Sequence, residues 1–308
     1  PLIVGSKEND LIGKDFMIAS ESTVLDSMGY KTIDDIQAGS AVFISSEGKI
    51  ETESCINNPI PTPCIFEYVY LARPDAKIDK ISVHKSRLRM GEFLAKKIIE
   101  QRPDHDIDVV IPIPDSSTTS ALQLATTLGI KYREGFVKNR YIGRTFIAPS
   151  QEMRALGVKM KLNPIRHNIE GQRLVVVDDS VVRGTTTRAI VQMLKSSGAA
   201  EVHLRISSPP YRWPCFYGMD TGTKSELMAA NLTMEEIQEY LGVNSIAYLE
   251  LDRLVDATGA PGAGFCTACL DGDYPVEIPV SLNSEVVITQ KDERDGGFVS
   301  AVQMGFQE

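Results

Sequence analysis

One stretch, residues 173–188, constrains the fold of this chain more than any other; it reads RLVVVDDSVVRGTTTR. Leu174 to Val177 is a continuous apolar run rich in β-branched residues, which is typical of a strand buried on both faces of a parallel sheet. Asp178 and Asp179 follow where that strand would end, and Arg183 to Thr187 then lead into a helical pattern. Backbone N–H groups at a helix N-terminus bind anions, and glycine lets the backbone approach closely. The stretch therefore predicts a phosphate-binding turn, with the two carboxylates facing sugar hydroxyls or Mg²⁺.

Two other interpretations of this stretch are less favourable. P-loop NTPases also carry acidic residues after apolar strands, but they need the pattern G-x-x-x-x-G-K-[ST], and no such string occurs in the sequence. A purely structural strand and turn would rarely place adjacent carboxylates before a glycine and three threonines. The phosphate-binding interpretation is therefore preferred.

Charge and cysteine content narrow the class of protein. The 308 residues carry a net charge of −9, which argues against nucleic acid or an anionic membrane as the main partner. No apolar run is long enough for a transmembrane helix, and no signal peptide opens the chain. Five cysteines, an odd number, favour a reducing cytoplasm over a disulfide framework. The first residue is Pro1, so we expect a fragment or a processed chain.

Composition along the chain predicts three regions. Residues 1–57 read as short β segments separated by glycines, with one helix at Ser20 to Met28, and they resemble the tail of a larger β-rich domain. A proline-rich hinge follows, and residues 58–270 are expected to form the main domain, entered by a strand at Cys64 to Pro74. Residues 271–308 are irregular and acidic, which is typical of a tail.

Within the main domain, strand and helix patterns alternate. Asp106 to Pro114 reads as a second buried strand, Asp115 to Thr119 as its terminal turn, and Ala121 to Leu128 as the next helix. The same order recurs around Asp178, so we expect an α/β fold with a doubly wound parallel sheet. Such sheets bind ligands at the carboxyl ends of their strands. The turns at 115–119 and 178–187 both belong to that edge.

A basic segment, residues 136–168, lies between these two turns in the sequence. In an acidic protein such a segment is either a solvated loop or a lid whose cations close on a polyanion. We favour the lid. Its candidate pyrophosphate ligands are Lys138, Arg140 and Arg144.

Four of the cysteines form a candidate metal set. Cys266 and Cys269 make a C-x-x-C pair, while Cys64 and Cys215 each follow a proline. Four thiolates suit a tetrahedral zinc ion or a [4Fe–4S] cluster, and four unconnected buried thiols are the alternative. From the residues alone, all three interpretations stay open.

Several long strings resemble one family. The stretch at 173–188 resembles the phosphoribosyl-pyrophosphate (PRPP) motif of type I phosphoribosyltransferases. The whole chain is similar to the glutamine PRPP amidotransferase family. The matching strings are FMIASES at 16–22, CIFEYVYLARPD at 64–75, VVIPIPDSS at 109–117, KNRYIGRTFI at 138–147, VVVDDSVVRGTTTR at 175–188 and PCFYG at 214–218. The resemblance implies that residues 1–57 are the end of an N-terminal-nucleophile glutaminase domain.

The resemblance also implies roles for residues. It implies that PRPP is bound by Asp178, Asp179, Ser180, Arg183, Gly184, Thr185, Thr186, Thr187, Lys138, Arg140 and Arg144. It implies a Mg²⁺ site at Ser116, Asp178 and Asp179. The cysteines resemble those of the iron–sulfur members, which favours a [4Fe–4S] cluster on Cys64, Cys215, Cys266 and Cys269. Purine nucleotides would be inhibitors and the intact protein a homotetramer.

One feature departs from the family pattern. The family's glutaminase nucleophile is an N-terminal cysteine, whereas here no cysteine precedes Cys55. Glutaminase activity, and any catalytic residue for it, therefore has no place on this chain. The implied reaction is displacement of pyrophosphate from PRPP by ammonia, giving 5-phosphoribosylamine, the first step of purine synthesis. The alternatives are a PRPP-binding regulatory module without catalysis and a salvage base phosphoribosyltransferase.

Overall fold

The computed structural model describes residues 1–10, 13–141, 160–219, 221 and 223–278. The chain folds into two compact units, one of Pro1–Arg87 with Val255–Cys266 and one of Leu88–Leu254 with Thr267–Glu308. This division differs from the predicted boundary between residues 57 and 58, because residues 58–87 belong to the first unit. None of the described helices is both long enough and apolar enough to cross a membrane.

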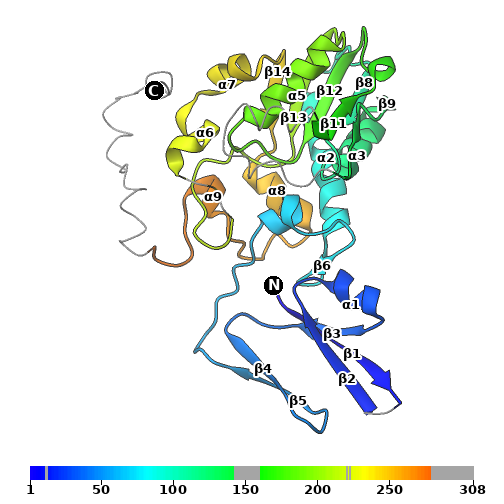
Figure 1. Ribbon diagram of the computed structural model, residues 1–308. Helices are drawn as coiled ribbons and strands as arrows, with labels where there is room; N and C mark the ends of the chain where they lie inside the picture. The colour runs from blue at the N-terminus through cyan, green and yellow to red at the C-terminus, as the bar shows by residue number, and fades with distance from the viewer. Residues whose placement is uncertain (11–12, 142–159, 220, 222, 279–308) are drawn as a thin grey trace. The chain divides into compact units, whose positions relative to one another are not determined.

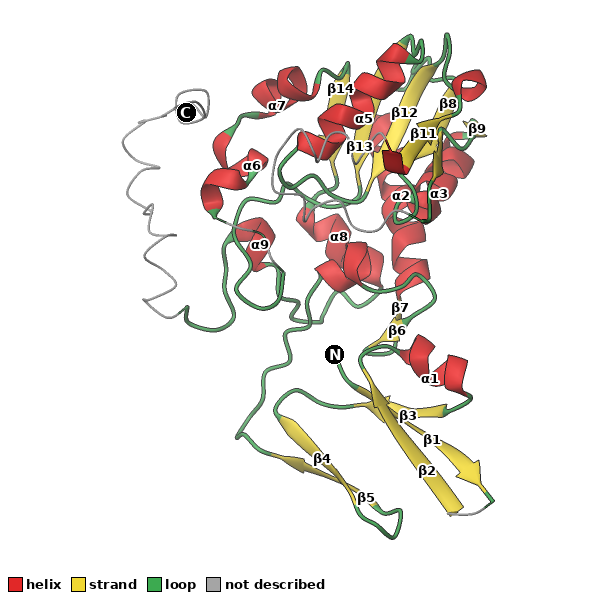
Figure 2. Cartoon of the chain, in the orientation of Figure 1, coloured by secondary structure: helices red, strands yellow, loops and turns green. Residues whose placement is uncertain are grey.

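The first unit is mainly antiparallel β structure (Figures 1 and 2). A three-stranded sheet has the order β2-β1-β3, and two hairpins, β4-β5 and β6-β7, accompany it. Its elements are β1 (Ile3–Asn9), β2 (Gly13–Ala19), α1 (Ser22–Met28), β3 (Lys31–Asp35), β4 (Ser40–Ile44), β5 (Ile50–Ser54), β6 (Lys77–Ile78) and β7 (Ile81–Ser82). The predicted β segments and helix are confirmed. The N-cap of α1 is Glu21, whose side chain does not cap the helix and instead accepts a hydrogen bond from Arg73 N at 3.2 Å.

The strand predicted at Cys64 to Pro74 is also wrong. Residues Glu67–Leu71 form a π-helix, in which Tyr68 and Val69 are buried. Arg87 explains this conformation in part, because its buried guanidinium donates hydrogen bonds to the carbonyl oxygens of Tyr68 (3.0 Å) and Ala72 (2.8 Å). These contacts come from a residue distant in sequence, so the β-rich composition of the segment could not reveal them.

The second unit is built on a five-stranded parallel sheet of order β14-β13-β12-β8-β9. In chain order the strands run 2-1-3-4-5, which is the flavodoxin-like doubly wound order with its switch point between β8 and β12. The expected α/β parallel sheet is confirmed. The strands are β8 (Val109–Pro112), β9 (Lys131–Tyr132), β12 (Arg173–Asp178), β13 (Glu201–Ile206) and β14 (Ser245–Tyr248).

Helices cover both faces of this sheet (Figure 2). Helix α3 (Thr118–Leu128) contacts β8, β9 and β12, α5 (Thr185–Ser196) contacts β13, and α7 (Met234–Leu241) contacts β14. The other helices that follow α1 are α2 (Val83–Gln101), α6 (Met228–Asn231), α8 (Leu251–Thr258) and α9 (Ala268–Asp271). A large apolar core joins the sheet to α5 and α7 through residues such as Val176, Leu204 and Ile190, each at most 1% exposed. A capping box of Thr233 and Glu236 begins α7.

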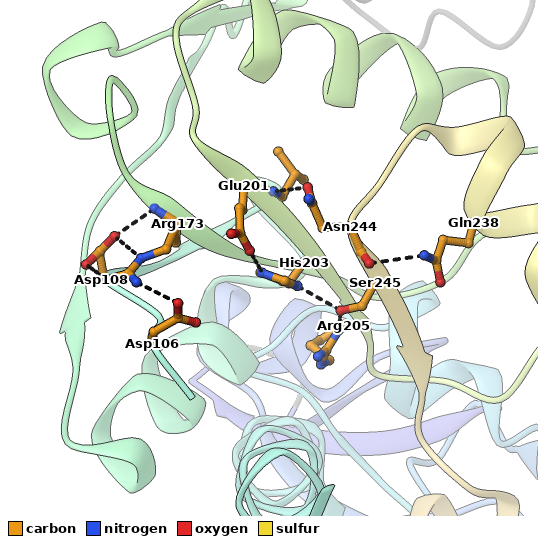
Figure 3. Close-up of polar contacts among 10 residues, drawn as sticks. Asp106, Asp108, Arg173, Glu201, His203, Arg205, Gln238, Asn244 and Ser245 are labelled. Carbon is orange, nitrogen blue, oxygen red and sulfur yellow. Dashed lines mark hydrogen bonds and ion pairs between the residues drawn. The ribbon is translucent and has the colours of Figure 1, made fainter. Parts of the chain in front are cut away.

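Polar contacts link neighbouring strands of the sheet near their amino ends (Figure 3). Arg173, at the start of β12, forms a two-pronged ion pair with Asp108, at 3.0 and 2.9 Å, and also contacts Asp106. On β13, His203 lies between Glu201 (2.7 Å) and Ser245 (2.9 Å). These contacts fix the strand register, and thereby align the carboxyl ends at which the predicted ligand-binding turns lie.

Candidate functional site

The two predicted turns meet at the switch point of the sheet. Strands β8 and β12 are hydrogen-bonded neighbours, with Pro112 opposite Val177. Each strand ends in a polar segment, Asp115 to Ser117 after β8 and Asp178 to Ser180 after β12. Ligands of doubly wound sheets bind in the crevice outside such carboxyl ends. The sequence prediction that these turns share one edge is therefore confirmed.

Serine hydroxyls from the first turn hold the carboxylates of the second. Ser116 Oγ donates a hydrogen bond to Asp179 Oδ2, and Ser117 Oγ donates to Asp178 Oδ1 at 3.4 Å. The main-chain N–H of Asp179 donates to the same Asp178 oxygen at 2.9 Å. Ser180 Oγ donates to Asp179 Oδ1 at 2.6 Å. The structure thus brings together all three predicted Mg²⁺ ligands, and it adds Ser117, which our interpretation of the sequence missed.

Both carboxylates are buried, with Asp178 8% and Asp179 7% exposed. Burial, and after it the charge of Asp179, raise the pKa of Asp178 well above its usual value. Two adjacent carboxylates that are poorly hydrated attract a cation or sugar hydroxyls, either of which would relieve their repulsion. Their hard oxygen donors, together with the Ser116 hydroxyl, suit Mg²⁺, which binds through one or two carboxylates and completes its shell with water and substrate phosphates.

The predicted phosphate turn has the expected geometry. Gly184 is the N-cap of α5 and adopts φ +75°, a conformation that a side chain would strain. A Cβ atom there would lie 2.5 Å from the sulfur of Met228, so any larger residue would require that side chain to move. The first turn of α5 consists of Thr185, Thr186 and Thr187. The N–H groups of the first turn of a helix have no intrahelical partner, so the start of this twelve-residue helix suits an anionic ligand.

The basic residues of the predicted lid have different positions. Lys138 ends β10 (Phe136–Lys138) and forms an ion pair with Asp115, which places an ammonium group beside the first turn. Strand β10 pairs with β11 (Leu162–Pro164), so the two ends of the basic segment meet at one point. Arg140 is exposed, and Arg144 lies outside the described residues, as does all of 142–159. Arg183 contacts Glu226, at 2.9 and 2.7 Å, a partner that our interpretation of the sequence did not anticipate.

The four candidate cluster cysteines are partly or fully buried. In the first unit, Cys64 and Cys266 form an isolated parallel β-bridge, with Ile65 N donating to Cys266 O at 3.2 Å. In the second unit, the main chains of Arg212 and Trp213 donate to Cys269 O at 3.0 and 3.1 Å, just before Cys215. Across the described residues, no three His, Cys, Asp or Glu side chains gather around a point where a metal ion could sit. The ligand set predicted for a cluster therefore stays a prediction.

The thiols nevertheless have features that suit thiolate ligands. Tyr217 N donates to Cys215 Sγ at 3.4 Å. Burial raises the pKa of Cys64 to about 11, while main-chain hydrogen bonds from Phe66 and Glu67 act in the opposite direction. A metal must displace the proton from such a thiol, and N–H groups pointing at sulfur stabilise the thiolate that results. Cysteine sulfur is the usual ligand of an iron–sulfur cluster, so these side chains are of the kind that the predicted cluster needs.

The fold and the site define the class of the protein. Residues 77–207 match the phosphoribosyl transferase domain family. The parallel sheet, its switch point and this match identify a type I phosphoribosyltransferase domain, the domain of a glycosyltransferase-type enzyme.

The particular proteins that the chain resembles are amidophosphoribosyltransferases. The Pseudomonas aeruginosa protein of that name is 49% identical over 277 residues, which cover 89% of this chain and 55% of the relative. The Escherichia coli protein is 44% identical over 260 residues, covering 84% and 52%. A solved structure of glutamine PRPP amidotransferase from B. subtilis, complexed with ADP and GMP, matches with a TM-score of 0.79 and 42% identity, covering 91% of this chain and 60% of that one. The chain spans about half the length of the curated relatives it matches.

Proposed function

We propose that this chain carries the phosphoribosyl-transfer half of an amidophosphoribosyltransferase. In the proposed reaction, ammonia attacks the anomeric carbon of PRPP, the bond to pyrophosphate breaks, and 5-phosphoribosylamine forms. The observation that carries the proposal is the hydrogen-bonded contact of the Ser116–Ser117 and Asp178–Asp179 turns at the sheet's switch point. The similarity to amidophosphoribosyltransferases over most of the chain supports it.

Different residues of the site bind different groups of PRPP. The turn from Ser180 to Thr187 holds the 5′-phosphate through main-chain N–H groups and hydroxyls. Asp178 and Asp179 bind the ribose hydroxyls, and their negative charge favours the positive charge that develops on the sugar ring. Lys138 stabilises the leaving pyrophosphate, with Arg140 and Arg144 as further candidates. Asp178, Asp179 and Ser116 would hold Mg²⁺, and the bound ion would neutralise the charge that develops on the leaving group.

The decisive experiment measures pyrophosphate release from PRPP by the purified chain. We expect release that requires both Mg²⁺ and an ammonium salt. Release that requires a purine base and ignores ammonia would instead identify a salvage enzyme. Saturable PRPP binding without release under any of these conditions would identify a regulatory module.

We also propose that Cys64, Cys215, Cys266 and Cys269 hold a [4Fe–4S] cluster. Anaerobically purified protein should then be brown and contain about four iron and four sulfide ions per chain. Stoichiometric zinc without iron would contradict the proposal. Cys55→Ser is the matched control, because Cys55 is exposed and outside the ligand set.

The remaining expectations concern the intact protein. The relatives are about twice as long, and we propose that residues 1–57 belong to a glutaminase domain that supplies the ammonia in the parent. Purine nucleotides are proposed inhibitors, since the B. subtilis structure is a complex with ADP and GMP. A cytoplasmic location and a homotetrameric parent complete the proposal; a sedimentation experiment on the parent would test the tetramer.

A further inference from the structure

The side chain of Arg183 is turned onto an acidic residue of a neighbouring segment. Its Nε and Nη2 atoms both donate to Glu226 Oε2, at 2.9 and 2.7 Å. Glu226 belongs to a short 3₁₀ turn, Lys224–Glu226, that precedes α6. A guanidinium held in this way has fewer N–H groups left for a phosphate than an unpaired one would have.

The segment that carries Glu226 is itself firmly built. The side-chain amide of Asn231 donates to three carbonyl oxygens, those of Lys224 (3.0 Å), Ser225 (3.2 Å) and Leu227 (2.7 Å). Lys224 lies over the Trp213 ring, 3.9 Å from its centroid. Leu227 is fully buried. These contacts give the carboxylate of Glu226 a rigid base, which is what a positioning group needs.

The same segment touches the phosphate turn at two further points. Met228 N donates to Val182 O at 2.9 Å, which ties its main chain to the residue before Arg183. The sulfur of Met228 occupies the space beside Gly184. Three successive residues of the turn, 182 to 184, are thus held by residues 226 to 228 through an ion pair, a hydrogen bond and a packing contact.

We propose that Glu226 is a positioning residue for the phosphate-binding turn, and that it holds the turn in place through its ion pair with Arg183. In this arrangement the anion is bound by the N–H groups and hydroxyls of Gly184 to Thr187. Arg183 contributes to the turn by its main chain, while its guanidinium braces the turn against Glu226. The inference rests on the proposed function, because it assigns a role within the same phosphate site.

The experiment measures binding of ribose 5-phosphate and of PRPP to the whole chain by calorimetry. The variants are Arg183→Gln, Glu226→Gln, the double variant, and the charge swap Arg183→Glu with Glu226→Arg. An exposed ion pair has a small coupling energy, so each single variant should weaken binding about two- to fivefold. The double variant should bind no more weakly than the single variant of lower affinity. The charge swap should restore most of the affinity of the unmodified chain. The exposed Glu100→Gln is the matched control.

Direct contact between Arg183 and phosphate gives the opposite pattern. Arg183→Gln would then weaken binding about tenfold or more, and Glu226→Gln would leave it unchanged or tighten it by releasing the guanidinium. The swap would abolish binding. Any of these results overturns the inference while the proposed function stands. Failure of the unmodified chain to bind either phosphate ester overturns both.

A steady-state measurement separates positioning from a loss of structure. The KM for PRPP should rise in the Glu226→Gln variant while kcat stays within about twofold, because a ground-state phosphate contact is equally present in the transition state. Glu226→Asp, which keeps the charge on a shorter side chain, should recover part of the loss. A lowered kcat at unchanged KM would contradict the assignment.

Discussion

Ser116, after β8, donates its hydroxyl to Asp179, after β12, and so joins two turns that lie 63 residues apart in sequence. The same carboxylate receives a second hydrogen bond from Ser180 at 2.6 Å. Asp179 is therefore oriented from both sides, and its orientation depends on the pairing of β8 with β12. This relationship makes the candidate site a property of the sheet rather than of either turn alone.

Replacement of Ser116 by alanine tests this relationship. The variant loses one hydrogen bond to a buried carboxylate and one candidate oxygen ligand of Mg²⁺. We expect roughly a tenfold loss in pyrophosphate release, and a higher Mg²⁺ concentration for half-maximal rate. The exposed Ser46→Ala is the control. If the Mg²⁺ dependence of Ser116→Ala were unchanged, Ser116 would not be a ligand of Mg²⁺.

The Asp178→Asn variant should gain stability and lose function. Burial, and then the charge of Asp179, raise the pKa of Asp178 in the folded chain. A carboxyl group with a raised folded pKa binds its proton more tightly when folded, so its ionisation destabilises the fold as pH rises above about 4. The amide removes that cost, so at pH 7 we expect unfolding of the variant in urea to require more free energy. Pyrophosphate release should fall by orders of magnitude. Equal or lower stability at pH 7 would show that Asp178 is not destabilising when ionised.

The buried His203 predicts a second dependence of stability on pH. Burial lowers the pKa of this imidazole, although Glu201 acts in the opposite direction. The unfolded chain then binds a proton more readily than the folded chain, so stability rises as pH increases from the lowered folded pKa to about 6.5. Urea unfolding between pH 5 and 8 should show this rise, and His203→Gln should flatten it. The exposed His84→Gln should keep the slope; an undiminished slope in His203→Gln would point to another group.

The ion pair of Asp108 with Arg173 should govern acid stability. Hydrogen bonds from Arg173 lower the pKa of Asp108 to about 2. A lowered carboxyl pKa contributes stability above the unfolded value of about 3.9, and this contribution is lost as pH falls towards 2. Asp108 is a third exposed, so we expect the contribution to be about 1 kcal/mol or less. Acid unfolding of Asp108→Asn, followed by circular dichroism, should begin at higher pH than that of the unmodified chain. Coincident curves would show that the pair contributes nothing.

Sequence patterns predicted the local elements of the sheet and the site better than the contacts between them. The strand β12 and the glycine turn that begins α5 were predictable, because buried parallel strands and glycine-containing turns leave local signatures in the sequence. The contact between Ser116 and Asp179 was foreseen only as a shared edge, since the pairing of β8 with β12 is non-local. Glu226 was missed because an exposed glutamate in a loop has no pattern. The π-helix at Glu67–Leu71 was mistaken for a strand because Arg87, a residue far along the chain, stabilises it.

The glycine of the phosphate turn offers the sharpest test of its geometry. Gly184 and Gly129 have similar positive φ values, +75° and +69°, but only Gly184 has a neighbour where a Cβ would lie. Alanine at either position should cost about 1–2 kcal/mol of unfolding free energy from backbone strain alone. Gly184→Ala should lose more, because Met228 must move, and the displaced turn should no longer bind ribose 5-phosphate. Gly129→Ala, at the end of α3, should bind it normally. Equal stability losses with intact binding in both variants would show that the turn tolerates a side chain, and that close approach of the Gly184 backbone is not what makes the anion site.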